Sequence, residues 1–161
     1  MMNYKIEVVT LPVADVDRAM AFYIALGFVV DVDYRPSRDY RVVQLTPPNS
    51  GCSIQFGAGL TDAAPGSARA TYLVVEDLET SHRELSERGL ELGPITHKAE
   101  IENWQGEVQA GIDNQHRDYA SLSTFADPDG NTWVLQEVGH RLTEPAGATA
   151  VPRASGSNDE R

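Results

Sequence analysis

An internal repeat places the strongest constraint on how this chain can fold. The segment TLPVADVDRAMAFYIALGF aligns without a gap with YLVVEDLETSHRELSERGL, so that matched residues lie 62 positions apart. Asp15 matches Asp77, and each Asp can accept hydrogen bonds from the free amides of a helix's first turn. Gly27 matches Gly89, and each suits the left-handed conformation that often ends a helix. A strand and helix unit is therefore used twice.

The residues around the repeat predict the elements of each half. Apolar residues recur at helical spacing after both Asp residues, and the period then changes to two, which is typical of strands. The predicted strands are FVVDVDY, YRVVQL and CSIQF in the first half and LELGPI, YASLSTFA and TWVLQE in the second. A type I turn at Asp127-Pro128-Asp129-Gly130 joins the last two. We predict an α+β fold in which each half is β-α-β-β-β.

The domain boundaries follow from this assignment. We predict a first module over residues 1–57, a linker over 58–69 and a second module over 70–140. The second module contains a long loop over 96–118 that has no counterpart in the first, and such loops are commonly functional. Residues 141–161 have no apolar period and predict a disordered tail.

Side chains suited to proton transfer gather in this loop and the strand after it. Glu137 ends TWVLQE, His116 and Asp118 can form an orienting pair, and Tyr119 offers a hydroxyl donor. These four are the candidate catalytic residues, because together they could move a proton next to a carbonyl group. A surface salt bridge between Arg117 and Asp118 is the alternative.

The other histidines lack such neighbours in the sequence. His82, His97 and His140 have no carboxylate or second His at the spacing of metal ligands. We expect them to be structural or solvated.

A second group of residues could bind a ligand without reacting with it. Trp104 and Trp133 offer aromatic faces, which attract flat or cationic molecules. Arg41 could orient an anionic or carbonyl group through its guanidinium fork, although a solvated hairpin charge is the alternative. Gln55, in SIQF, offers an amide.

Several motifs in order resemble a known family. The paired V-x-D helix starts, AFYIALGF and DPDGNTWVLQE are similar to the vicinal oxygen chelate superfamily of glyoxalases, extradiol dioxygenases and bleomycin-resistance proteins. The resemblance covers about residues 5–138. It implies two βαβββ modules that form a cup-shaped mixed sheet around a ligand, and a two-fold homodimer. It does not imply one reaction, because one fold hosts many chemistries.

The resemblance also implies where a metal would bind. Family members that use a metal have ligands at the start of the first strand and near the end of the last strand of each module. The corresponding residues are Val8, Gln55, Ala70 and Glu137. Two of these have no lone pair to give, and zinc or iron normally needs about three protein ligands. We therefore expect no metal cofactor, with a divalent ion held by Gln55, Glu137 and His116 as the alternative.

Strand alternation then assigns side chains to faces. If Gln55 faces the cup, Ile54 and Phe56 pack beneath the helices. With Glu137 as the counterpart of Gln55, Glu137 and Trp133 also face the cup. The two counterparts lie 82 positions apart rather than 62, which implies an insertion of about 20 residues.

Composition limits the partners. The net charge of −11 argues against nucleic acid, because binding phosphates requires clustered Lys and Arg. Cys52 is the only cysteine, so no internal disulfide can form. No apolar run approaches the roughly 18 residues that cross a bilayer. We expect a cytoplasmic protein that binds a small molecule and neither nucleic acid nor membranes.

Two functions agree with these features. The first is a glyoxalase-like enzyme, a lyase or isomerase that acts on a carbonyl compound without the usual metal site. We favour the enzyme because the family that these motifs resemble consists largely of enzymes. The alternative is a metal-free protein of the bleomycin-resistance type that sequesters a small aromatic or cationic molecule. An inward Glu137 paired with His116 or Tyr119 would favour the enzyme.

Overall fold

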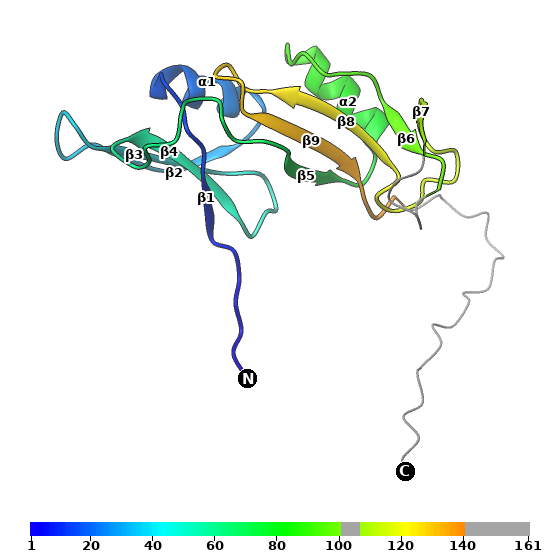
Figure 1. The fold of residues 1–161 in the computed structure, drawn as a ribbon, viewed down its shortest axis with the longest axis horizontal. Coiled ribbons are helices and arrows are strands. Elements are labelled where there is room, and N and C mark those ends of the chain that lie inside the picture. The colour runs from blue at the N-terminus through cyan, green and yellow to red at the C-terminus, as the bar shows by residue number, and fades with distance from the viewer. Residues whose placement is uncertain (101–106, 141–161) are drawn as a thin grey trace.

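The computed structural model describes residues 1–100 and 107–140, which form two sheets and two helices (Figure 1). The first half contains β1 (Val8–Thr10), α1 (Val16–Ala25), β2 (Val29–Tyr34), β3 (Arg41–Thr46) and β4 (Ser53–Ala58). The second contains β5 (Thr71–Val75), α2 (Leu78–Glu87), β6 (Thr96–Lys98), β7 (Val108–Ala110), β8 (Ser121–Ala126) and β9 (Thr132–Glu137). Trp104 and the tail 141–161 lie outside the described residues.

Each half of the chain forms its own sheet. The strand orders are β1-β4-β3-β2 and β5-β9-β8-β6-β7. In each sheet the first and last strands of the module pair in parallel, β1 with β4 and β5 with β9, while the remaining neighbours are antiparallel. The predicted α+β class with two repeated modules is confirmed.

The caps predicted from the repeat are present in both helices. The Asp15 carboxylate accepts the Arg18 amide at 3.0 Å, and the Asp77 carboxylate accepts the Thr80 amide at 2.8 Å. That hydrogen bond lowers the pKa of Asp77 below its ordinary value. Both helix starts therefore follow directly from the sequence.

The prediction of a strand over 90–95 is wrong. Pro94 has no amide to donate to a neighbouring strand, and Leu90 is buried in the core. The pairing begins later, at β6, which lies between β8 and β7 within the segment predicted as a long loop. The described residues of the second module thus form one strand more than expected.

The hydrophobic core joins the two modules. Tyr23 of α1 is fully buried, and its ring centroid lies 5.8 Å from that of Phe56 in the first sheet and 5.9 Å from that of Trp133 in the second. Phe28 and Phe125 complete the aromatic contacts around Trp133. Because α1 packs on both sheets, this core fixes the position of one module relative to the other.

The turn between β8 and β9 forms a polar clamp next to this core. The carboxylate of Asp127 accepts hydrogen bonds from the Tyr23 hydroxyl at 2.8 Å and from the Asn131 side chain at 2.8 Å. The same Asn131 amide donates to the Pro12 carbonyl of the first module. Burial first, and then the nearby charge of Asp127, raise the pKa of Tyr23. Asp127 and Asn131 of the DPDGN turn thus join the second module to Tyr23 and Pro12 of the first.

Gly66 closes the segment that joins the modules. Its φ is +75°, and a Cβ atom there would lie 1.9 Å from the Asp129 carbonyl oxygen. Only glycine can allow this approach. The joining segment is therefore packed against the turn of the second module.

The described residues include no helix that is both long and apolar enough to span a bilayer. The cytoplasmic location remains a prediction from the sequence.

Candidate functional site

The register of the sheets changes the predicted counterpart of Gln55. Gln55 pairs with Thr10, and Val134 pairs with Tyr72. Thr10 and Tyr72 are themselves 62 positions apart, as in the repeat. Val134 is therefore the counterpart of Gln55, three residues before Glu137. An odd shift along a strand moves a side chain to the opposite face.

Glu137 and Trp133 consequently lie on the helix side of the second sheet. Trp133 is buried in the core, and a carboxylate oxygen of Glu137 accepts the amide of Leu78, the first residue of α2, at 3.0 Å. The prediction that both share the face of Gln55 is wrong. Gln55 itself donates to the Thr10 hydroxyl at 2.9 Å.

The positions that bind metal in the family that the motifs resemble do not fit an ion here. With the corrected register they are Val8, Gln55, Ala70 and Val134. Only the amide of Gln55 could coordinate, whereas a zinc or iron site needs about three protein ligands.

Glu137 is nevertheless at the centre of a cluster of ionisable groups. Its side chain is 0% exposed. One carboxylate oxygen faces the N-terminus of α2, where amides and the helix dipole stabilise a negative charge. The other lies 3.0 Å from Nδ1 of His116. The structure thus brings together two of the four candidate catalytic residues.

His140 is the member of the cluster that the sequence interpretation missed. Its Nδ1 lies 3.5 Å from the Glu137 carboxylate and 3.0 Å from the Glu76 carbonyl oxygen. Its ring stacks on that of His116, with centroids 3.8 Å apart and planes 13° from parallel. Glu137 and His140 are three residues apart, and the positive φ of Gly139 turns the chain back between them. The spacing was visible in the sequence, but the turn was not.

The other two catalytic candidates are engaged elsewhere. The Asp118 carboxylate accepts the Gly139 amide at 2.7 Å, so the expected pair of His116 and Asp118 is not formed. Tyr119 is exposed, and it is its backbone amide that donates to the carbonyl oxygen of Glu137. Both residues shape the chain around the cluster.

Asp113 organises the turn that presents His116. Its buried carboxylate accepts the Arg117 amide at 3.0 Å and the Arg117 Nε at 2.8 Å. These hydrogen bonds lower its pKa from 3.8 to about 2. Arg117 therefore pairs with Asp113 and not, as the alternative held, with Asp118.

This pair predicts how stability depends on pH. Because the folded pKa of Asp113 is depressed, its contribution is complete above the ordinary pKa of 3.8 and is lost as the pH falls toward 2. We expect Asp113→Asn to lower the free energy of unfolding by about 2 kcal/mol at pH 7. Urea titrations should show that the difference from wild type shrinks between pH 5 and about pH 2.5. A difference that stays constant over this range would contradict the assigned ion pair.

Arg41 lies in the first module and is used within it. Its guanidinium donates to Asp33 at 2.9 Å and to Asp17 at 2.8 Å. The hydrogen bonds from Arg41 lower the pKa of Asp33. The structure does not bring Arg41 near the cluster around Glu137.

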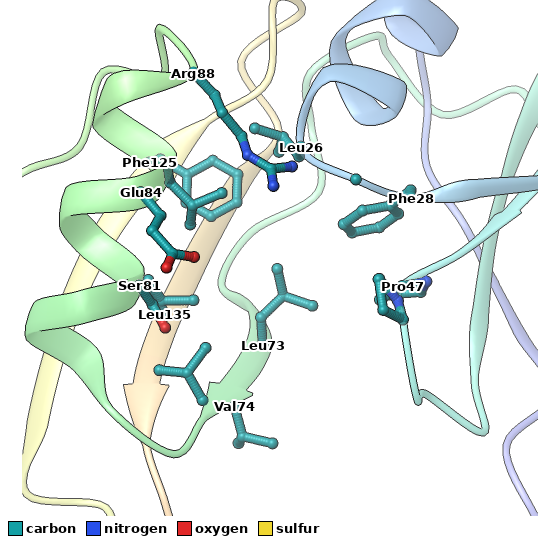
Figure 2. A pocket seen from close by; sticks show the side chains of 14 residues that line it. Leu26, Phe28, Pro47, Leu73, Val74, Ser81, Glu84, Arg88, Phe125 and Leu135 are labelled. Atoms are coloured by element: carbon teal, nitrogen blue, oxygen red, sulfur yellow. The ribbon is translucent and has the colours of Figure 1, made fainter.

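A cleft of about 380 Å³ opens where the two modules meet (Figure 2). The end of α1 and the turn after β3 line one side, and β5, β9 and α2 line the other. The lining residues are Leu26, Gly27, Phe28, Pro47, Pro48, Leu73, Val74, Val75, Ser81, Glu84, Leu85, Arg88, Phe125 and Leu135. Its walls are therefore mainly apolar.

Among the described residues, the charged and hydroxyl side chains of the cleft come from α2 and from Arg88, the residue that caps its C-terminus. Figure 2 shows the carboxylate of Glu84 and the guanidinium of Arg88 turned toward the open space, near Ser81. Within residues 1–100 and 107–140, neither charged side chain forms an ion pair or a hydrogen bond. Both charges are thus free to meet a ligand.

A second hollow of about 600 Å³ continues the cleft along β5. The two share Pro47, Pro48, Leu73, Val74 and Val75. This hollow is also lined by Glu76, whose carbonyl oxygen contacts His140, and by Val138, the residue after Glu137. The cleft therefore extends toward the cluster around Glu137.

Comparison with known proteins assigns the chain to a family. The sequence profile of the Glyoxalase/Bleomycin resistance protein/Dioxygenase superfamily matches residues 5–135. The chain belongs to this superfamily, as its motifs indicated. None of the curated proteins matches the sequence.

Solved structures share the fold over most of the chain. A glyoxalase/bleomycin resistance/dioxygenase superfamily member from Sphaerobacter thermophilus DSM 20745 is 25% identical over 85% of this chain and 99% of its own, with a TM-score of 0.63. A glyoxalase/bleomycin resistance protein from Streptomyces sp. CB03234 is 25% identical, with a TM-score of 0.61, over 83% of this chain and 100% of its own. TnmS3, an antibiotic-binding protein from the same organism, is 24% identical over 86% and 98%, with a TM-score of 0.64.

Proposed function

We propose that this protein binds and sequesters a small, largely apolar molecule in the cleft between its modules, without catalysing a reaction. The observation that carries the proposal is the composition of the cleft. Apolar side chains form most of its wall, and among the described residues that line it Glu84 and Arg88 are the only ionisable ones. A site of this kind provides burial and orientation.

The size and charges of the cleft suit a flat ligand with a polar end. A volume of about 380 Å³ lies within the range of small-molecule sites. Phe28 and Phe125 offer aromatic contact from the two modules, while Glu84 and Arg88 can pair with charged groups of either sign. TnmS3 is an antibiotic-binding protein with the same fold, which agrees with this use of the scaffold.

An enzyme remains the second candidate, because Glu137 and His116 are within hydrogen-bonding distance of each other. A buried carboxylate next to an imidazole could move a proton. However, both carboxylate oxygens of Glu137 already accept hydrogen bonds, one of them from the first amide of α2. A structural role for Glu137 at the start of α2 explains these hydrogen bonds without any substrate. This favours the binding function.

A ligand screen distinguishes these functions. We expect aromatic antibiotics and related natural products to raise the melting temperature of the purified protein, because a ligand that binds only the folded state stabilises it. Mass spectrometry after overnight incubation at stoichiometric concentration should recover each ligand unchanged. Conversion of a stabilising compound by the wild-type protein, but not by Glu137→Gln, would instead establish the enzyme.

We also propose that two copies form a homodimer, as the family implies. Among the described residues, no strand pairs with the outer edge of β2, and Val29, Val32 and Tyr34 are exposed along this strand. Such an edge commonly pairs with another chain. Sedimentation at micromolar concentration should give twice the mass of one chain, and a monomer mass would contradict the proposal.

A further inference from the structure

The distances within the cluster around Glu137 resemble those between ligands of a single metal ion. Nδ1 of His116 lies 3.0 Å from one carboxylate oxygen, and Nδ1 of His140 lies 3.5 Å from the other. Ligands about 2.1 Å from a shared ion lie about 3.0 to 3.4 Å from one another. One donor atom from each of the three residues can be chosen so that all lie within 4.8 Å of one another.

We propose that His116, Glu137 and His140 bind a divalent first-row transition metal ion at the end of β9. Two imidazoles and one carboxylate are a ligand set suited to zinc, iron, nickel or cobalt. Glu137 is fully buried and supplies the negative charge, while the two imidazoles are 15% and 17% exposed, which leaves a path for the ion and for water ligands. The ion replaces the protons in the contacts of His116 and His140 with the Glu137 carboxylate.

Neighbouring groups support the three ligands. The Leu78 amide holds one carboxylate oxygen of Glu137 in place, and partners of this kind orient metal ligands. The Glu76 carbonyl oxygen, 3.0 Å from Nδ1 of His140, is a further oxygen donor on the same side. The two rings must tilt out of their stacked arrangement to share the ion, and their partial exposure gives them room.

This site is separate from the positions that bind metal elsewhere in the family. Those positions are Val8, Gln55, Ala70 and Val134, on the strand face opposite to that of Glu137. The three proposed ligands come instead from the turn after β7, the end of β9 and the residues that follow it. None of the three proposed ligands lines the cleft between the modules, so metal binding can be measured separately from ligand binding there.

Titration of the metal-free protein with Co²⁺ tests the site. The full chain should carry no added histidines, so that its four native histidines are the only ones present. We expect visible absorption bands that saturate at one Co²⁺ per chain, and competition by Zn²⁺. His140→Gln should weaken Co²⁺ binding by at least about tenfold. Losing a residue that only supports a metal ligand already weakens metal binding by about that factor. Glu137→Gln should weaken it at least as much.

His97→Gln is the matched control, because His97 is half-buried on β6, where its Nδ1 contacts the Gly111 carbonyl oxygen, and is not a member of the cluster. It should bind Co²⁺ like the wild type. If Glu137→Gln does not fold, His140→Gln still decides the outcome, because His140 lies at the surface end of the cluster. Absence of saturable bands at millimolar Co²⁺, or equal binding by His140→Gln and wild type, would overturn the proposal.

Discussion

Replacing Asn131 by alanine is expected to lower the free energy of unfolding by about 3 to 4 kcal/mol. Asn131 is 0% exposed, and its side chain bonds to the Pro12 carbonyl, the Asp127 carboxylate and the Ala68 amide. Alanine would leave these groups buried without a partner, and each such group costs about 1 to 3 kcal/mol. The loss is large because Asn131 connects three parts of the chain. Pro12 lies in the first module, Asp127 in the second and Ala68 in the segment that joins them.

Urea unfolding at pH 7 measures this loss, and Asn114→Ala is the control. Asn114 is exposed, so its replacement should change the free energy of unfolding by less than about 0.5 kcal/mol. If Asn131→Ala were as stable as Asn114→Ala, the clamp would not join the modules.

Replacing Glu137 by alanine is expected to cost about 3 kcal/mol of stability. The change removes the acceptor of the Leu78 amide and of His116 and takes a negative charge from the start of α2. Glu137→Gln should cost less than half as much, because its amide oxygen can still accept the Leu78 amide. Thermal and urea unfolding of the two variants gives both values.

The same two variants separate structure from chemistry at this residue. Under the helix-cap interpretation, Glu137→Gln retains ligand affinity in the cleft. If both variants kept full stability while ligand affinity or turnover fell at least about tenfold, Glu137 would serve a ligand, as its place in the sequence first suggested.

The fold could be predicted because its determinants are local. Asp15 and Asp77 cap their helices through residues three positions away, so the repeat is visible without any tertiary contact. A strand over 90–95 was predicted because these residues alternate as in a strand. The prediction was wrong because Pro94 lacks an amide and Leu90 is buried in the core. Such tertiary packing overrides a local pattern.

The face of Glu137 could not be predicted from alternation alone. Alternation correctly grouped Trp133 with Glu137, but the side to which they point depends on the length of the insertion before β8. An error of three residues in that length was enough to reverse the face. The pairing of Val134 with Tyr72 resolves it, and pairing is a property of the folded sheet.

A turn and the meeting of the two modules account for the other missed residues. Glu137 and His116 were both candidates, but their partner His140 joins them only after a turn at Gly139. Leu73 of β5 and Leu85 of α2 also pack against the core, so an apolar residue type at these positions does not by itself indicate a cleft. They line the cleft because the two modules meet there and leave space.

The most direct test of the proposed function blocks the cleft and measures binding of a neutral aromatic probe. Ser81 lies on the cleft side of α2, whereas Ser86 is exposed on the same helix and does not line the cleft. Titration of N-phenyl-1-naphthylamine, followed by fluorescence, should saturate with wild type and with Ser86→Trp. Ser81→Trp should weaken binding by at least about tenfold, or about 1.4 kcal/mol, at unchanged stability. Equal affinity in Ser81→Trp and Ser86→Trp would show that the cleft does not hold the ligand.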